Sequence, residues 1–120
     1  MIYGIGTDLV EMHRIKKAIE RDTFFKRIYT IKEQELIQTD WKKAAGNFAV
    51  KEAVVKVFGT GFRAIAPNQI EVLRDEFGKP YVVLYETASE FAKKHQLKLH
   101  ISITNTREYA SAFVVGEVLS

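Results

Sequence analysis

The stretch Phe48-Ala49-Val50-Lys51-Glu52-Ala53-Val54-Val55-Lys56-Val57-Phe58-Gly59-Thr60-Gly61 organises the rest of the chain. Up to Phe58 it is apolar almost all round, which is typical of a helix buried among other elements. Glu52 and Lys56 stand four residues apart and therefore share one face of that helix. Charged side chains are rarely buried unless they are paired or functional. This pair is therefore either an ordinary intrahelical ion pair or part of a site.

The glycine turn that follows the helix adds a second feature. In Gly59-Thr60-Gly61 two glycines flank a hydroxyl, and glycines end a helix and let a backbone or a ligand come close. A carboxylate, an ammonium and a glycine turn together are compatible with a phosphate and metal site. The alternative is a Glu–Lys pair with a glycine cap, which contributes only a few tenths of a kcal/mol. The helix taken alone favours this alternative.

Length and composition predict one globular domain over residues 1–120. The chain is 47% hydrophobic and 28% charged, which suits a single core in a soluble protein. The formal charge of +3 mildly favours an acidic partner, whether nucleic acid, an acidic protein or a phosphorylated small molecule. The absence of cysteine excludes disulfides and thiolate metal sites and fits a cytoplasmic location. Early acidic residues argue against a signal peptide, and no apolar run is long enough to span a membrane.

The N-terminal segment 2–7 is predicted to be a strand. Gly4 and Gly6 share one face of it, which predicts close approach of another backbone. Asp8 is expected to end the strand, where it could cap the next helix or bind a metal. Residues 11–21 form the pattern of an amphipathic helix whose polar side is rich in cations, which raises the odds of an acidic partner.

The remaining chain reads as helices and hairpins in alternation. A capping box at Thr30/Glu33 predicts a helix near 31–38. A second capping box at Thr87/Glu90 predicts a helix that ends at about His95. Asp40 is expected to cap the long helix from Trp41 to Phe58. Strands are predicted at 70–74, 81–85, 98–104 and 109–117. This order predicts an α+β fold with a mainly antiparallel sheet packed around a long central helix.

Three separated stretches resemble the signatures of holo-acyl-carrier-protein synthases, a family of the 4′-phosphopantetheinyl transferase superfamily. The matching residues are Gly4–Glu11 followed by Arg14-Ile15, then Phe48–Ala53 with Lys56 and Gly59–Gly61, and finally Gly78-Lys79-Pro80 with His100–Thr104. They stand in order, at suitable spacing, over essentially the whole chain. As a set they are specific, and they outweigh the ordinary ion-pair interpretation of the central helix.

The resemblance implies the 4′-phosphopantetheinyl transferase fold and its reaction. Coenzyme A would donate its phosphopantetheine arm to a serine of an acyl carrier protein, with adenosine 3′,5′-bisphosphate as the other product, in fatty acid biosynthesis. Because the serine oxygen attacks the β-phosphorus of the pyrophosphate, catalysis would consist mainly of positioning and of neutralising developing charge. The resemblance also implies a cytoplasmic homotrimer with its sites at subunit junctions.

The resemblance assigns roles to individual residues. Asp8 and Glu52 match the two metal-binding acids, and Mg²⁺ suits one or two carboxylates plus substrate phosphate oxygens. Lys56 would hold the pyrophosphate, and Gly59, Thr60 and Gly61 would admit coenzyme A. Glu52, directly or through a water on the metal, is the candidate base for the serine proton. Arg14, Lys17 and Arg21, on the basic helix, are expected to bind the acidic carrier protein.

The contacts to the nucleotide end of coenzyme A depart from the family pattern. Ser102, Thr104 and Asn105 are expected to contact coenzyme A. The residue after the Ser-x-Ser/Thr run is commonly His in the family and here is Asn105. The residue before Phe48 is commonly Arg and here is Asn47. Asn keeps its hydrogen-bond donors but carries no charge, so the cations Lys42, Lys43 or Arg107 are candidates to compensate.

Two other functional classes compete with the transferase. A small basic nucleic-acid-binding module would explain the net charge but not Asp8, Glu52 or the glycine turn. Its aromatic residues also do not interleave with cations as a stacking platform requires, so we expect no nucleic-acid partner. A non-catalytic interaction protein that kept the fold is the third possibility.

Overall fold

The computed structural model describes residues 1–120 as two antiparallel sheets arranged around one long helix. The first sheet has three strands in the order β1-β5-β4, and the second has two, β2 and β3. Their bounds are β1 Ile2–Glu11, β2 Ile70–Arg74, β3 Pro80–Leu84, β4 Leu97–Asn105 and β5 Tyr109–Val118. The predicted α+β class is confirmed, with two sheets where the sequence suggested one.

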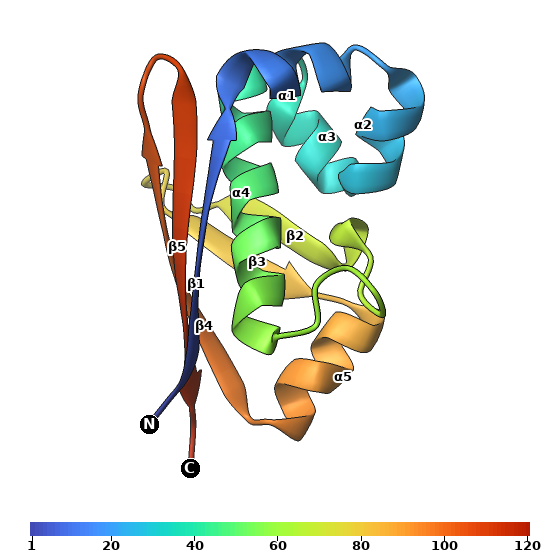
Figure 1. Cartoon of the computed structure of the whole chain (residues 1–120). Helices are drawn as coiled ribbons and strands as arrows, with labels where there is room; N and C mark the ends of the chain where they lie inside the picture. Colours follow the sequence, from blue (N-terminus) through green and yellow to red (C-terminus); the bar gives the residue numbers. More distant parts are fainter.

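The long helix α4 lies along one face of the three-stranded sheet, and the shorter helices flank it (Figure 1). The helices are α1 Met12–Ile19, α2 Asp22–Ile28, α3 Ile31–Ile37, α4 Trp41–Phe58 and α5 Glu86–Lys94, with a short 3₁₀ turn η1 at Pro67–Gln69. Figure 1 places α1, α2 and α3 together near the start of α4, and α5 near its end. No helix combines the length and the apolar character needed to cross a membrane.

Two glycines of β1 let α4 pack directly on the strand. A Cβ added at Gly6 would lie 2.0 Å from the carbonyl oxygen of Ala53, and one added at Gly4 would lie 3.1 Å from that of Val57. A Cβ added at Gly116 of β5 would meet the Val57 side chain at 2.6 Å. The predicted close approach of a second backbone is therefore confirmed, and that backbone is the one of α4.

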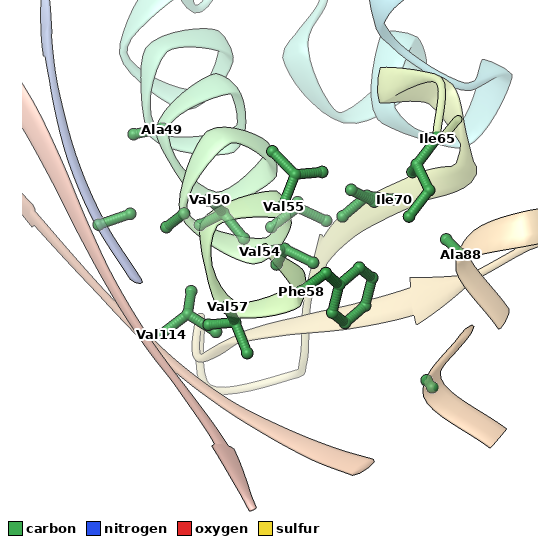
Figure 2. Packing of buried hydrophobic residues seen from close by; sticks show 14 residues of the cluster. Ala49, Val50, Val54, Val55, Val57, Phe58, Ile65, Ile70, Ala88 and Val114 are labelled. Atoms are coloured by element: carbon green, nitrogen blue, oxygen red, sulfur yellow. The ribbon is translucent and has the colours of Figure 1, made fainter. Parts of the chain in front are cut away.

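The hydrophobic core surrounds the second half of α4. Figure 2 shows Phe58 projecting toward Ala88 of α5 and Val57 beside Val114 of β5, and Val50 and Val54 belong to the same cluster. A second cluster lies under α1, α2 and α3 and includes Tyr29 and Ile37, each only 1% exposed. Because α4 contacts the three-stranded sheet, β2 and the small helices at once, it is apolar on nearly every side.

The opposite face of the three-stranded sheet is apolar but uncovered. On β5, Ala112 and Val114 face α4 and are buried, whereas Phe113 between them is 49% exposed. Ile5 and Leu9 of β1 are 61% and 63% exposed on that same side. The last strand is therefore apolar on both faces, as its sequence indicates, yet within one chain only one face is packed.

Helix ends follow the predicted caps in two cases. Thr30 and Glu33 form a complete capping box at the start of α3. Asp40 accepts hydrogen bonds from the backbone nitrogens of Lys42 and Lys43 at the start of α4. These local signals were sufficient because each side chain needs only its own helix to satisfy it.

Two local predictions are wrong. Asp8 does not end the first strand, because pairing with β5 continues from Asp8 opposite Ala112 to Glu11. Thr87 does not cap α5, because its hydroxyl donates instead to the carbonyl oxygen of Ala64 at 2.9 Å.

Candidate active site

Asp8 lies on the side of β1 that faces α4. Side chains alternate along a strand, so Gly4, Gly6 and Asp8 share one face. Gly6 has no side chain and lets α4 come close. Asp8 is the next residue on the same face, so its carboxylate lies beside the helix. Its side chain is only 16% exposed. Burial raises the pKa of the Asp8 carboxyl, and the nearby Lys56 ammonium partly opposes that rise.

Lys56 connects α4 to this part of β1. Its Nζ donates to the carbonyl oxygen of Thr7 at 2.8 Å and lies 3.4 Å from Oδ1 of Asp8. The Lys56 side chain is 52% exposed, so its ammonium still reaches solvent. The Lys56 ammonium is therefore held beside Asp8 and can still contact an anionic ligand from solvent.

Glu52 completes the group one helical turn before Lys56. Burial raises the pKa of the Glu52 carboxyl, the negative charge of Asp8 raises it further, and Lys56 lowers it. The pKa values of both neighbouring carboxyls are raised, so their ionised forms are disfavoured. A bound cation would stabilise the two negative charges. The structure thus brings together Asp8, Glu52 and Lys56, as the sequence predicts. No cluster of three or more His, Cys, Asp or Glu side chains suited to a metal occurs in the chain.

The glycine turn at the end of α4 is open. Gly59 and Gly61 have φ values of +77° and +60°, a conformation that favours glycine. A Cβ added at either position would meet nothing within 4 Å. The backbone nitrogens of Gly59 and Thr60 donate to the carbonyl oxygen of Val55. Backbone conformation, and not crowding, therefore requires glycine here, and the space beside the turn is accessible.

Two of the remaining predicted contacts for coenzyme A lie on another surface. Ser102 and Thr104 of β4 are exposed, as is Asn105 at the strand end. Ser102 stands opposite Phe113, and Phe113 stands opposite Thr7, so this row lies on the uncovered face of the sheet. The row containing Asp8 faces α4 instead, so one chain does not bring Ser102 and Thr104 together with the two acids. Asn105, opposite Ala110, belongs by register to the face toward α4, at the end of the strand.

The predicted carrier-binding cations do share one surface. Arg14 and Lys17 lie on α1, and Arg21 directly precedes α2. Together with His13 and Ala18 they line an open hollow of about 460 Å³. Arg14 also lies 3.7 Å from Glu11, a pair that is exposed and therefore weak. The hollow keeps a strong excess of positive charge.

Asn47, which stands where the family commonly has Arg, lies in the interior of the chain and not on its surface. It is fully buried, and its Nδ2 donates to Oε2 of Glu33 at 3.0 Å and to the carbonyl oxygen of Val72 at 2.9 Å. Its Oδ1 has no hydrogen-bond partner. Asn47 therefore works inside the protein, in a polar cluster that the sequence did not reveal.

The centre of that cluster is a buried ion pair between Lys51 and Glu33. Both side chains are 0% exposed, and Nζ of Lys51 lies 2.7 Å from Oε1 of Glu33. Burial lowers the pKa of Lys51 and raises that of Glu33, while each partner's charge opposes the shift of the other. Lys51 precedes Glu52 in the central helix, and a charged residue on an otherwise apolar helix was the only sequence feature that pointed to a buried ion pair. Its partner 18 residues away carries no sequence mark except its place in a capping box.

Comparison with known proteins identifies the family. The model of the 4′-phosphopantetheinyl transferase superfamily matches residues 4–114. The chain belongs to this superfamily. A curated holo-(acyl-carrier-protein) synthase from Lachnoclostridium phytofermentans is 62% identical over 120 residues, with 99% of this chain and 98% of that protein covered.

Solved structures place the chain among phosphopantetheinyl transferases as well. A holo-(acyl-carrier-protein) synthase from Bacillus anthracis, in complex with coenzyme A (3′,5′-ADP), is 34% identical with a TM-score of 0.84, and 99% of each chain is covered. The synthase from Neisseria meningitidis is 32% identical with a TM-score of 0.88, covering 98% of this chain and 99% of that one. The predicted phosphopantetheinyl transferase fold is confirmed.

Proposed function

We propose that this chain, acting as one transferase domain over residues 1–120, transfers the 4′-phosphopantetheine arm of coenzyme A to a serine of apo acyl carrier protein. The other product is adenosine 3′,5′-bisphosphate, and the process served is fatty acid biosynthesis in the cytoplasm. The observation that carries the proposal is the meeting of Asp8, Glu52 and Lys56 between β1 and α4. A chain 62% identical to a holo-(acyl-carrier-protein) synthase presents this group beside an open glycine turn.

The two acids fit Mg²⁺. This ion is usually bound by one or two carboxylates, with substrate phosphates and water filling its other positions. Asp8 and Glu52 supply two hard oxygen ligands; burial raises the pKa of Glu52, and the negative charge of Asp8 raises it further. When bound there, Mg²⁺ would neutralise charge on the pyrophosphate as it develops.

The protein groups around the acids divide the remaining work. Lys56, tethered to the carbonyl oxygen of Thr7, would bind a pyrophosphate oxygen and stabilise negative charge in the transition state. Glu52 is the group that we propose to accept the proton of the attacking serine, directly or through a water; burial raises the pKa of its carboxyl, which makes it a stronger base. The open turn Gly59–Gly61 would let the phosphopantetheine end approach the backbone.

The basic hollow on α1 would bind the carrier protein. Carrier proteins of this class are acidic, and opposite charge accelerates association and fixes orientation more than it adds affinity. Arg14, Lys17 and Arg21 line the hollow, and α1 directly follows β1, the strand that carries Asp8. A carrier protein docked there would be placed near the two acids.

The uncovered sheet face supports a homotrimer. Ile5, Leu9 and Phe113 expose apolar surface there, and contiguous apolar patches of this kind commonly mark contacts between proteins. Ser102 and Thr104 lie on the same face, and the exposed Asn105 follows them at the strand end. In a closed ring with heterologous contacts, one subunit would present these residues to the Asp8–Glu52 group of its neighbour. Each active site would then form at a subunit junction.

One incubation tests the proposed reaction. The protein is mixed with coenzyme A, Mg²⁺ and an apo carrier protein, and the carrier is weighed by mass spectrometry. The proposal expects a gain of one phosphopantetheine group, and no gain with Glu52→Gln. An unmodified carrier would favour a non-catalytic interaction protein. Binding to nucleic acid without transfer would favour the basic nucleic-acid-binding module, which leaves the Asp8–Glu52 pair without a role.

A further inference from the structure

The buried ammonium of Lys51 uses all its donors inside the protein. The three donors of its ammonium reach Oε1 of Glu33 at 2.7 Å, the carbonyl oxygen of Pro67 at 2.9 Å, and the carbonyl oxygen of Ile70. Glu33 in turn also accepts from the backbone nitrogens of Thr30 at 3.1 Å and Val72 at 3.2 Å. Lys51 therefore joins α4 to α3, η1 and the start of β2.

Apolar packing does little to select the rotation of α4, because a helix that is apolar almost all round can bury any of its faces. On the sheet side α4 packs on the bare Gly6, which has no side chain to fit into the helix. Hydrogen bonds, in contrast, require both a distance and a direction. Other directional contacts are fewer for each side chain: Lys56 makes one hydrogen bond to the Thr7 carbonyl oxygen, from a half-exposed side chain. The Lys51 ammonium is thus the strongest directional restraint on this part of α4.

We propose that Lys51 is a positioning residue, whose buried ammonium fixes the rotation of α4 and thereby holds the Glu52 carboxylate beside Asp8. Successive residues of a helix point about 100° apart, so Lys51 faces the cluster while Glu52 faces β1. A change at the first residue turns the second. The inference rests on the proposed function, since it concerns the geometry of the same two acids.

Three variants separate positioning from simple stabilisation. Lys51→Met removes the ammonium and leaves Glu33 buried without its partner, which is strongly destabilising. Lys51→Met combined with Glu33→Gln removes both charges and should recover most of the melting temperature, because a neutral replacement of a buried pair is often tolerated. Ile37→Ala, a buried side chain of α3 in the second hydrophobic cluster and outside the hydrogen bonds of Lys51, provides a matched loss of stability.

The double variant decides the question. We expect kcat to fall about 10–100-fold and the Mn²⁺ concentration for half-saturation, followed by electron paramagnetic resonance with coenzyme A present, to rise by a similar factor. Ile37→Ala should keep both values within about two-fold of the parent protein. Normal kcat and normal Mn²⁺ binding in the double variant would overturn the inference, as would equal losses in Ile37→Ala. If the parent protein transfers nothing, the proposed function fails, and the Mn²⁺ titrations alone still decide whether Lys51 positions Glu52.

Discussion

Gly6→Ala tests how closely α4 and β1 must approach for the site to work. The added Cβ would lie 2.0 Å from the carbonyl oxygen of Ala53, whereas ordinary contact begins at 3.4 Å. The helix must therefore retreat by roughly 1.4 Å, the difference between those two distances, because a backbone carbonyl cannot rotate away. Overpacking of this kind costs about 3 kcal/mol. A misplacement of about 1 Å at a reacting centre can cost on the order of 100-fold in rate.

Gly4→Ala is the matched control on the same strand face. Its Cβ would lie 3.1 Å from the carbonyl oxygen of Val57, a contact that a shift of a few tenths of an ångström relieves. Alanine also restricts the unfolded chain, which offsets about 0.4–1 kcal/mol, so the net change should be below about 1 kcal/mol. Urea unfolding gives both free energies, and kcat is measured at a temperature where both variants stay folded. A Gly6→Ala protein with parental stability and parental kcat would refute the packing argument.

Three further predictions concern the acids, the carrier surface and the assembly. Asp8→Asn and Glu52→Gln should remain folded but lose nearly all transfer. Burial raises the pKa of Glu52, so the ionised carboxyl destabilises the metal-free fold. Glu52→Gln should therefore resist urea better than the parent protein at pH 8 but not at about pH 4, near the ordinary pKa of Glu. Arg14→Glu should raise the KM for carrier protein and weaken its salt dependence while leaving the KM for coenzyme A unchanged. Lys94→Glu, at another exposed position on α5, should change neither the KM for carrier protein nor its salt dependence. Glu52→Gln and Asn105→Asp subunits, each inactive alone, are refolded together in equal amounts. Roughly one quarter of all sites should then be active, because each mixed cyclic trimer has one junction where both halves are intact. Assembled trimers without any activity would rule out a shared site.

Features that depend on neighbours in the chain could be predicted from the sequence. The glycines of β1 indicated a close backbone contact, and the structure supplies it at Ala53. The alternating pattern over residues 98–104 predicted a strand, and the structure has β4 there, with Leu97, Leu99, Ile101 and Ile103 packed against the core. The family signatures also located the acids on the two elements that meet, although the sequence placed Asp8 at a strand end and the structure places it within β1.

Features that depend on distant partners could not be predicted. Thr87 has every local mark of a capping residue, but the carbonyl oxygen of Ala64 competes for its hydroxyl. Asn47 occupies a position where the family pattern suggested a ligand contact, yet the Glu33 carboxylate draws it into the core. Glu33 itself already had a complete role in its capping box, so nothing in the sequence indicated that it also neutralises Lys51.

The stoichiometry of the two products tests the central claim most directly. The protein is incubated with coenzyme A, Mg²⁺ and limiting apo carrier protein, and adenosine 3′,5′-bisphosphate is quantified beside the modified carrier at successive times. A transferase that uses Asp8, Glu52 and Lys56 as described releases one bisphosphate for each phosphopantetheine attached to a carrier serine, and Lys56→Met slows both products together. Release of bisphosphate without modification of the carrier, or modification that persists undiminished in Lys56→Met, would contradict the account.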